Sequence, residues 1–185
     1  RFLHILGASG SGTTTLGAAL ATRFAIQHLD TDDFFWYPTE PKFHQTRPAA
    51  ERLRLLGRAM DRAAAGWVLS GSLAGWGDPL VDRFDLAIFL SLPADLRLAR
   101  LRAREVGRYG AAIEPGGPLH EQHIEFMKWA TAYDLGGQDM RSRKLHESWL
   151  LDIPCPILRL DSSLPVPTLV KLVVEQPAGR QRQTA

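Results

Sequence analysis

Short apolar runs alternate along the chain with longer segments whose apolar residues recur at helical spacing. The runs predict five strands and the longer segments predict helices between them. Strands that alternate with helices indicate one α/β domain with a parallel sheet. The strands are expected at 2–6, 26–29, 67–70, 85–92 and 157–160. The helices are expected at 13–24, 48–65, 93–109, 120–133, 140–151 and 167–175.

The first predicted strand runs directly into a glycine-rich loop, Gly-Ala-Ser-Gly-Ser-Gly-Thr-Thr at 7–14. The loop matches the phosphate-binding pattern G-x-x-x-x-G-K-[ST] except at Thr13, where the pattern has lysine. Its setting between a strand and a helix favours a phosphate loop over an ordinary turn, because N–H groups at the start of the helix attract anions. The residues expected to contact the phosphates are Gly7, Ser9, Gly10, Ser11, Gly12, Thr13 and Thr14.

Three carboxylates follow the second predicted strand, at Asp30, Asp32 and Asp33. Open parallel sheets bind ligands at the carboxyl ends of their strands. One of these carboxylates could hold magnesium, which prefers oxygen ligands and often takes only one or two carboxylates beside nucleotide phosphates. The alternative is that an aspartate caps the short segment that follows.

Three further segments are rich in glycine, proline or aromatic residues and lack periodicity. Residues 36–48 are predicted to form a mobile or substrate-facing loop, although their aromatic rings could simply pack. The turn that contains Gly71 and Trp76 would let a ligand approach the backbone, or it is an ordinary turn. Residues 110–119 carry three glycines and two prolines and are the best candidate for a flexible lid.

The helix predicted at 93–109 has one cationic and one apolar side. At about 100° per residue its arginines at 97, 100, 104 and 108 share one stripe. Leu96, Ala99, Ala103 and Val106 cluster on another side and are expected to pack. The arginine stripe is either a solvated face or a source of cations for phosphate oxygens.

Composition restricts the partners and the compartment. The formal net charge of +2 is too small to indicate general nucleic-acid binding, although arginines far outnumber lysines. The apolar runs are too short to span a bilayer, and the first residues do not form an export signal. The single cysteine, Cys155, cannot form an internal disulfide. These features predict a cytoplasmic protein without a membrane segment.

In its element order and its loop at 7–14 the chain resembles the small P-loop kinases of the adenylate kinase and shikimate kinase type. Within that group it is most similar to uncharacterised bacterial ATP-binding proteins of the adenylate-kinase-like kind. The resemblance implies a three-layer P-loop NTPase fold, with a five-stranded parallel sheet flanked by helices. It covers a single domain at 1–175 with a small lid near 108–120, followed by a polar tail at 176–185.

The resemblance also implies a function and a set of roles. It implies ATP and Mg²⁺ as cofactors and transfer of the γ-phosphoryl group to a nucleoside monophosphate or another small-molecule acceptor. Thr14 and Asp30 would hold magnesium. Asp32 would orient the acceptor, together with Asp33, Gly71 and Trp76. The catalytic set would be Asp32 with three arginines that neutralise the moving phosphoryl group, Arg104, Arg141 and Arg143.

Thr13 divides the possible functions, because a cation beside the γ-phosphate is missing from the loop. The protein is either a kinase in which an arginine replaces the lysine or a catalytically weak or inactive nucleotide-binding or regulatory module. A third alternative, arginine-mediated nucleic-acid binding, is disfavoured by the small net charge.

Overall fold

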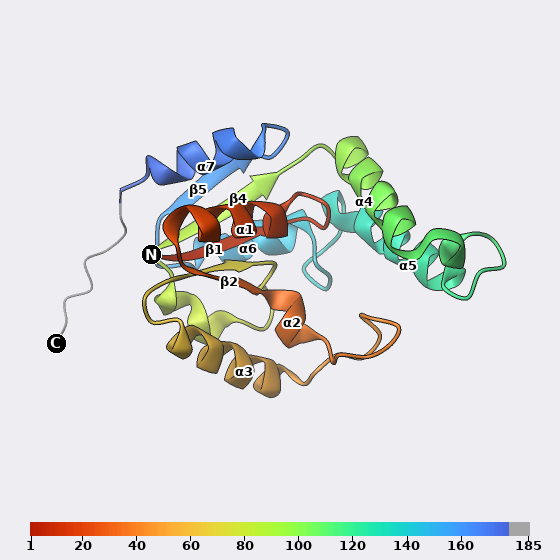
Figure 1. Cartoon of the computed structure of the whole chain (residues 1–185), viewed down its shortest axis with the longest axis horizontal. Helices are drawn as coiled ribbons and strands as arrows, with labels where there is room; N and C mark the ends of the chain where they lie inside the picture. Colours follow the sequence, from red (N-terminus) through yellow and green to blue (C-terminus); the bar gives the residue numbers. More distant parts are fainter. Residues whose placement is uncertain (178–185) are drawn as a thin grey trace.

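A computed structural model describes residues 1–177 and shows one sheet of five parallel strands in the order β2-β3-β1-β4-β5 (Figure 1). The sequence predicted each strand to within one residue at either end. Of the predicted tail at 176–185, residues 178–185 lie outside the described part. The strands are β1 Phe2–Gly7, β2 Gln27–Asp30, β3 Trp67–Ser70, β4 Leu86–Ser91 and β5 Ile157–Asp161.

Helices cover both faces of this sheet. One face packs against the helices at either end of the chain, α1 and α7, and the other against α3 and α6. Because both faces are covered, the central strands are almost entirely apolar, as the sequence shows. The α-helices are α1 Thr13–Phe24, α2 Thr31–Phe35, α3 Ala49–Arg62, α4 Ala94–Tyr109, α5 His120–Thr131, α6 Arg143–Leu151 and α7 Val166–Val174.

Successive residues of the central strand β1 point into opposite cores. Leu3 and Ile5 pack with Leu16 and Leu20 of α1, whereas Leu6 packs with Leu56 of α3. This alternation follows from the two-residue period of a strand. Strand β1 therefore packs against the helices on both faces of the sheet, and the phosphate loop begins where β1 ends.

The strand register brings the predicted site segments to one edge of the sheet. Asp30 at the end of β2 is level with Ser70 at the end of β3, and Ser70 is level with Ile5 of β1. The Gly71 N–H donates to the Ile5 carbonyl at 2.9 Å. The carboxyl ends of three neighbouring strands therefore hold the loop, the carboxylates and the glycine turn within reach of each other.

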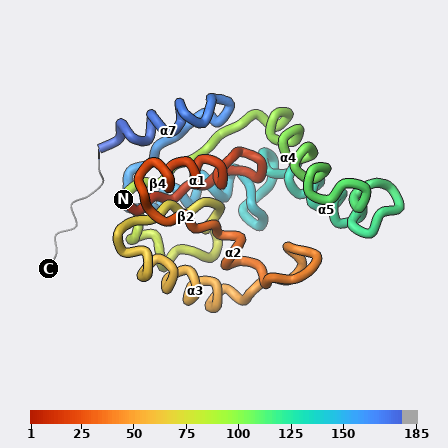
Figure 2. Tube along the Cα trace, in the orientation of Figure 1, coloured from red at the N-terminus to blue at the C-terminus, as the bar shows by residue number. Residues whose placement is uncertain are grey.

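Helices α4 and α5 form an arm that extends away from the sheet (Figures 1 and 2). The predicted lid segment lies at the far end of this arm, where residues Gly110–Ile113 form a short 3-10 helix, η2. The turn that follows is closed by a bond from the Leu119 N–H to the Ala112 carbonyl at 2.8 Å. That this segment acts as a lid stays a prediction.

The sequence predicted the wrong packing face for α4. Leu96 and Val106 are 46% and 54% exposed, whereas Arg97, Leu101 and Glu105 form the buried stripe. The Arg97 guanidinium donates to the Ala130 carbonyl and to the Asp134 carboxylate, each at 2.8 Å. A charged side chain is stable inside a protein only when such partners surround it, and periodicity along one helix does not reveal partners from another segment.

No helix within residues 1–177 is both long enough and apolar enough to cross a membrane.

We expect Arg97→Ala to lower the free energy of unfolding by roughly 3 kcal/mol, because it leaves the Ala130 carbonyl and the Asp134 carboxylate without this donor. Urea unfolding measures the change. Arg102→Ala, at an exposed position of the same helix, should change the free energy by less than about 0.5 kcal/mol. Equal stability of the two variants would contradict the assigned role of Arg97.

Candidate functional site

The loop at 7–14 has the backbone of an anion cradle. Gly10 and Gly12 adopt φ values of 84° and 92°, which side chains other than glycine rarely adopt. Gly12 is the residue just before α1 and has no side chain to cap it, so the first N–H groups of the helix are left for a ligand. The buried Ser11 hydroxyl has no hydrogen-bond partner within residues 1–177. A phosphate would satisfy both kinds of donor.

Two loop glycines are also required by close packing. A Cβ atom on Gly7 would lie 2.7 Å from the Leu90 carbonyl oxygen of β4. A Cβ atom on Gly10 would lie 2.8 Å from the Arg97 carbonyl oxygen of α4. The loop is therefore held between the sheet and the base of the arm.

Asp30 connects three elements at the mouth of this loop. Its carboxylate accepts hydrogen bonds from the Thr14 hydroxyl at 2.8 Å, the Ser70 hydroxyl at 2.9 Å and the Asp32 N–H at 3.0 Å. The bond from Asp32 makes Asp30 the cap of α2, so the capping alternative is correct. The bonds from α1 and β3 place the same carboxylate at the phosphate loop. Capping and ligand binding are thus compatible at this position.

His28 also belongs to this group, although the sequence gave no reason to select it. Its Nε2 atom lies 3.0 Å from the Ser70 hydroxyl. A Cβ atom on Gly17 would lie 2.6 Å from the same nitrogen, so glycine at this position of α1 leaves room for the imidazole. The alternation of β2, which points His28 and Asp30 to the same side, is the signal that could have found it.

The oxygen donors at the loop fit magnesium. Thr14 Oγ1 and the Asp30 carboxylate lie together, and Mg²⁺ commonly takes one or two protein oxygens and completes its shell with phosphate and water. Within the described residues, no three His, Cys, Asp or Glu side chains converge into a cage that would hold a metal unaided. The site therefore suits a cation that arrives with a phosphorylated ligand.

Asp32 and Arg141 interact electrostatically near the mouth of the loop. Surrounding protein and the Asp30 charge raise the pKa of Asp32, against smaller opposing effects of Arg141, a hydrogen bond from Trp36, and Arg104. Burial lowers the pKa of Arg141, while Asp32, Tyr133 and Asp30 oppose this shift. A half-buried cation thus lies near two carboxylates.

The three arginines predicted to assist catalysis occupy different places. Arg141 faces the carboxylates, and its guanidinium carbon lies 5.5 Å from the centre of the Trp129 ring. Arg104 acts on Asp32 from α4, but it also lies 3.3 Å from Glu105. Arg143 pairs with Asp134 at 3.4 Å. Of the three, Arg141 is the most closely associated with the carboxylates.

The helix predicted to begin at 140 begins at Arg143, and the reason is a capping bond. The Ser142 hydroxyl accepts from the Leu145 N–H at 3.0 Å and donates to the Gly137 carbonyl at 2.6 Å. Arg141 therefore precedes the helix and is held by the capped turn, while Arg143 lies in its first turn. Two arginines that are only two residues apart in the sequence therefore lie in different local structures.

Asp33 lies in a different environment from Asp32. Partial burial and the charge of Asp30 raise its pKa, while His28 and Lys42 oppose the shift. Arg141 contributes to the pKa of Asp32 but not to that of Asp33. The two carboxylates that the sequence grouped together therefore face different cations.

A group of aromatic rings forms the other side of the mouth. Phe35 lies 5.0 Å from Trp36 and 6.2 Å from Trp76, and Trp36 lies 6.0 Å from Phe43, measured between ring centres. The Trp76 indole N–H donates to the Ser72 carbonyl at 3.2 Å. Segment 36–48 is therefore tied to the turn after β3 through its rings.

Gly71 provides the close approach in this turn. Its φ of 101° is left-handed, and a Cβ atom there would lie 1.9 Å from the Thr31 hydroxyl. The turn therefore lies directly against α2, next to the carboxylates.

Arg52 was missed in the sequence, and its surroundings show why it matters. Its guanidinium carbon lies 3.6 Å from the centre of the Phe35 ring and 5.7 Å from that of Trp76. Its Nε donates to the Arg47 carbonyl at 2.7 Å, but its terminal nitrogens have no hydrogen-bond partner within residues 1–177. The position of an arginine in the first turn after an aromatic loop could have indicated an anion site.

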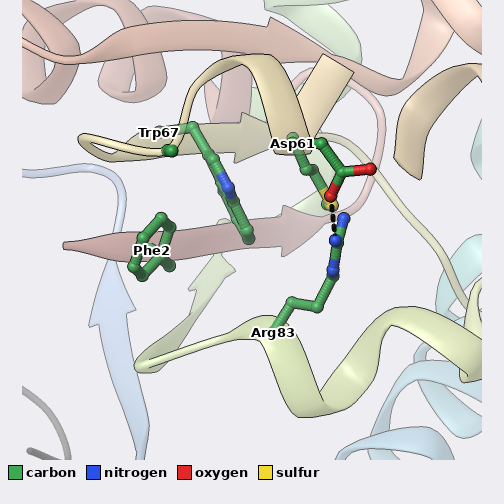
Figure 3. Close-up of a pocket in the computed structure, with 6 residues that line it drawn as sticks. Phe2, Asp61, Trp67 and Arg83 are labelled. Atoms are coloured by element: carbon green, nitrogen blue, oxygen red, sulfur yellow. Dashed lines mark hydrogen bonds and ion pairs between the residues drawn. The ribbon is translucent and has the colours of Figure 1, made fainter. Parts of the chain in front are cut away.

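A separate pocket of about 250 Å³ lies at the opposite edge of the sheet, where β1 and β3 begin (Figure 3). Arg83 reaches Asp61 across it and donates to the Gly57 carbonyl at 3.1 Å. Parallel sheets bind ligands at the carboxyl ends of their strands, so this pocket lies outside the candidate site. Its lining residues are Phe2, Met60, Asp61, Ala64, Trp67 and Arg83.

Comparison with curated proteins finds one relative along nearly the whole chain, although no protein-family model matches. The uncharacterized protein YqaC of Bacillus subtilis (strain 168) is 46% identical over 173 residues, which cover 94% of this chain and 95% of that protein. A cytidylate kinase of Methanocorpusculum labreanum is 30% identical over 117 residues, which cover 56% of this chain and 62% of the kinase.

Solved structures share the fold at low sequence identity. Deoxyadenosine kinase from M. mycoides with bound dATP gives a TM-score of 0.56 at 14% identity, covering 94% of this chain and 97% of its own. Shikimate kinase from Acinetobacter baumannii in complex with shikimate gives 0.53 at 19% identity, covering 94% and 90%. The chain therefore has the P-loop kinase fold, and the predicted resemblance to adenylate and shikimate kinases is confirmed.

We expect Asp32→Asn to stabilise the fold at neutral pH. The folded-state pKa of Asp32 is raised, so its ionised form destabilises the protein above that pKa, and the penalty disappears as the pH falls below the unfolded value near 3.8. The gain at pH 7 should be on the order of 0.5 kcal/mol after solvent screening. Urea unfolding between pH 4 and pH 8 tests this.

The matched control is Asp82→Asn, at an exposed position in the 3-10 helix Asp78–Arg83 (η1), away from the site. A gain for Asp32→Asn that stays constant across the pH range, or that Asp82→Asn shares, would contradict the electrostatic explanation.

Proposed function

The chain belongs to the family of the Bacillus subtilis protein YqaC, and from this premise we propose that it transfers the γ-phosphoryl group of Mg·ATP to a small acceptor that carries an anionic group. The observation that carries the proposal is the arrangement at one edge of the sheet. An anion cradle, an oxygen site at Asp30 and the facing pair Asp32 and Arg141 lie together there.

The chemistry follows from the positions of these groups. A hydroxyl or phosphate oxygen of the acceptor bonds to the γ-phosphorus while the bond from that phosphorus to the bridging oxygen breaks. The electron pair leaves on the β-phosphate, and ADP is released. Asp32, whose pKa is raised, accepts the hydrogen bond of the acceptor and takes its proton where one is released.

Thr14 and Asp30 would hold magnesium, which when bound offsets the charge of the phosphate oxygens. The rest of the catalysis is positioning and electrostatics supplied by the chain itself. The loop N–H groups and the Ser11 hydroxyl hold the phosphates, and Asp30 fixes Thr14 relative to the third strand.

The Arg141 guanidinium replaces the positive charge of the loop lysine, because position 13 is threonine in this chain. The lysine of a standard phosphate loop reaches the β- and γ-phosphates from within the loop. Arg141 instead approaches from the capped turn before α6 and faces Asp30 and Asp32. The arm of α4, η2 and α5, which also carries Arg104, acts as the lid over this site.

The acceptor binds beside the Arg52 guanidinium, which already stacks on Phe35, and next to the ring of Trp76. The free terminal nitrogens of Arg52 suit a phosphate or carboxylate, and Trp76 and Phe35 suit a ring or a sugar face. One partial relative is a cytidylate kinase, and one structural neighbour is a shikimate kinase seen with shikimate, which supports a small-molecule acceptor. Nucleoside monophosphates and small cyclic acids are the first candidates.

A second candidate function is nucleotide binding without efficient transfer. It is favoured by a specific observation, the threonine at the position of the loop lysine. The cradle and the oxygen donors do not depend on that lysine, so binding would survive its absence.

Calorimetric titration with Mg·ATP followed by an acceptor screen tests the proposal. We expect ATP to bind and ADP to form only with an anionic acceptor. Arg52→Leu should raise the acceptor KM at least about tenfold, because a charge-assisted contact is lost, while ATP affinity stays unchanged. ATP binding without transfer to any acceptor would support the second candidate. Failure of both ATP and GTP to bind at millimolar concentration would exclude both.

Substitution of the two neighbouring arginines distinguishes their roles. We expect Arg141→Ala to lower kcat by roughly 100- to 1000-fold, the effect of losing one preorganised charge partner of the transition state. Arg143→Ala, which removes one of the two arginines paired with Asp134, should lower kcat less than about fivefold.

The double variant Thr13→Lys with Arg141→Ala tests whether the two cations are equivalent. If Arg141 replaces the loop lysine, the double variant should recover part of the rate lost in Arg141→Ala. Equal losses for Arg141→Ala and Arg143→Ala, with no recovery by lysine, would refute the replacement.

A further inference from the structure

Three polar side chains form a hydrogen-bonded line beneath the candidate site. The Ser72 hydroxyl lies 2.9 Å from His146 Nε2, and the Tyr133 hydroxyl lies 2.9 Å from His146 Nδ1. All three residues are at least 95% buried. They come from the turn after β3, from α6, and from the 3-10 helix Ala132–Asp134, called η3. No step described above uses them.

The line contains a neutral imidazole. Burial, followed by the charges of Arg141 and His4, lowers the pKa of His146 to about 3. A neutral histidine has one N–H and one free ring nitrogen, so it donates to one hydroxyl and accepts from the other. Both ring nitrogens are therefore satisfied, and removing either partner would leave a buried polar atom unpaired, which is costly.

Each end of the line meets a part of the candidate site. At one end, the Ser72 hydroxyl accepts from the Ala74 N–H at 3.3 Å, and the Ser72 carbonyl holds the Trp76 indole. At the other end, the backbone N–H of His146 donates to the Ser142 carbonyl at 3.0 Å, so His146 lies one helical turn from Ser142, the residue that follows Arg141. The Tyr133 ring centre lies 5.2 Å from the guanidinium carbon of Arg97. The line therefore spans from the acceptor turn to the segment that presents the cation.

We propose that His146 is a positioning residue that fixes the acceptor turn, with Trp76, relative to Arg141. The proposal rests on the proposed phosphoryl transfer, since it assigns His146 to that site. His146 does not touch the reacting groups. It sets how far the ring that holds the acceptor lies from the charge that stabilises the moving phosphoryl group.

Two substitutions divide the line at different bonds. In His146→Asn the side-chain amide lies near the position of Nδ1, so the bond to Tyr133 is kept and the bond to Ser72 is lost. In His146→Gln the amide reaches the position of Nε2, so the bond to Ser72 is kept and the bond to Tyr133 is lost. Ser72→Ala and Tyr133→Phe remove the same two bonds from the other side and keep the packing.

The expected result is a division between acceptor KM and kcat. His146→Asn and Ser72→Ala should raise the acceptor KM about tenfold with kcat within about twofold of the wild type. His146→Gln and Tyr133→Phe should lower kcat about tenfold with little change in KM. If all four variants change KM and kcat alike, in proportion to their loss of thermal stability, His146 is only structural and the proposal fails.

A measurement without turnover separates this proposal from the proposed function. The NMR signal of the Arg141 Nε–H group can be assigned by its absence in Arg141→Lys. Tyr133→Phe, which is expected to lower kcat, should shift this signal in the ligand-free protein, and Ser72→Ala, which is expected to leave kcat nearly unchanged, should shift it much less. An unmoved signal in Tyr133→Phe would overturn the proposal even in an active enzyme. A shifted signal in a protein that phosphorylates no acceptor would instead count against phosphoryl transfer. The Ser72 and Tyr133 variants decide the question if the His146 variants do not fold.

Discussion

The hydrogen bonds accepted by the Asp30 carboxylate are the interactions on which the site depends. This carboxylate accepts from Thr14 in α1, from Ser70 in β3 and from the backbone of α2, so three elements share one acceptor. These bonds require β2 and β3 to end level with each other, which their register provides. A parallel sheet alone would bring the segments close, and this carboxylate fixes them to each other at hydrogen-bond distance.

A second set of polar contacts fixes the position of the arm. The guanidinium of Arg97 is held by the end of α5 and by Asp134, and the adjoining Tyr133 leads through His146 to the acceptor turn. Such buried polar groups stabilise one arrangement because any other leaves some of them unpaired. The phosphate loop, the turn after β3 and the start of α6 are therefore positioned by hydrogen bonds, while the apolar layers supply the general stability of the fold.

The sequence predicted the fold well because both faces of the sheet are covered, which makes the strands short apolar runs between clear helices. The phosphate loop was found from the spacing of its residues and from its setting between a strand and a helix. The packing face of α4 was wrong, because Arg97 is buried by partners distant in sequence. Arg52 and His146 were missed for the same reason, since their importance comes from rings and hydroxyls of other segments. Arg141 was selected together with Arg143, and only the Ser142 cap separates them.

The contact between Gly10 and Arg97 gives the arm a mechanical property. Helix α4 has 16 residues and is therefore about 24 Å long, and its base lies against the phosphate loop while its far end carries η2. Helix α4 therefore has the geometry of a lever that turns about its contact with Gly10 in the loop. A tilt of about ten degrees about the contact with Arg97 would displace the far end, about 18 Å away, by about 3 Å. In the proposed function, the loop that binds the phosphates is thus also the pivot of the lid, so a small adjustment at the loop would be magnified at the far end of α4.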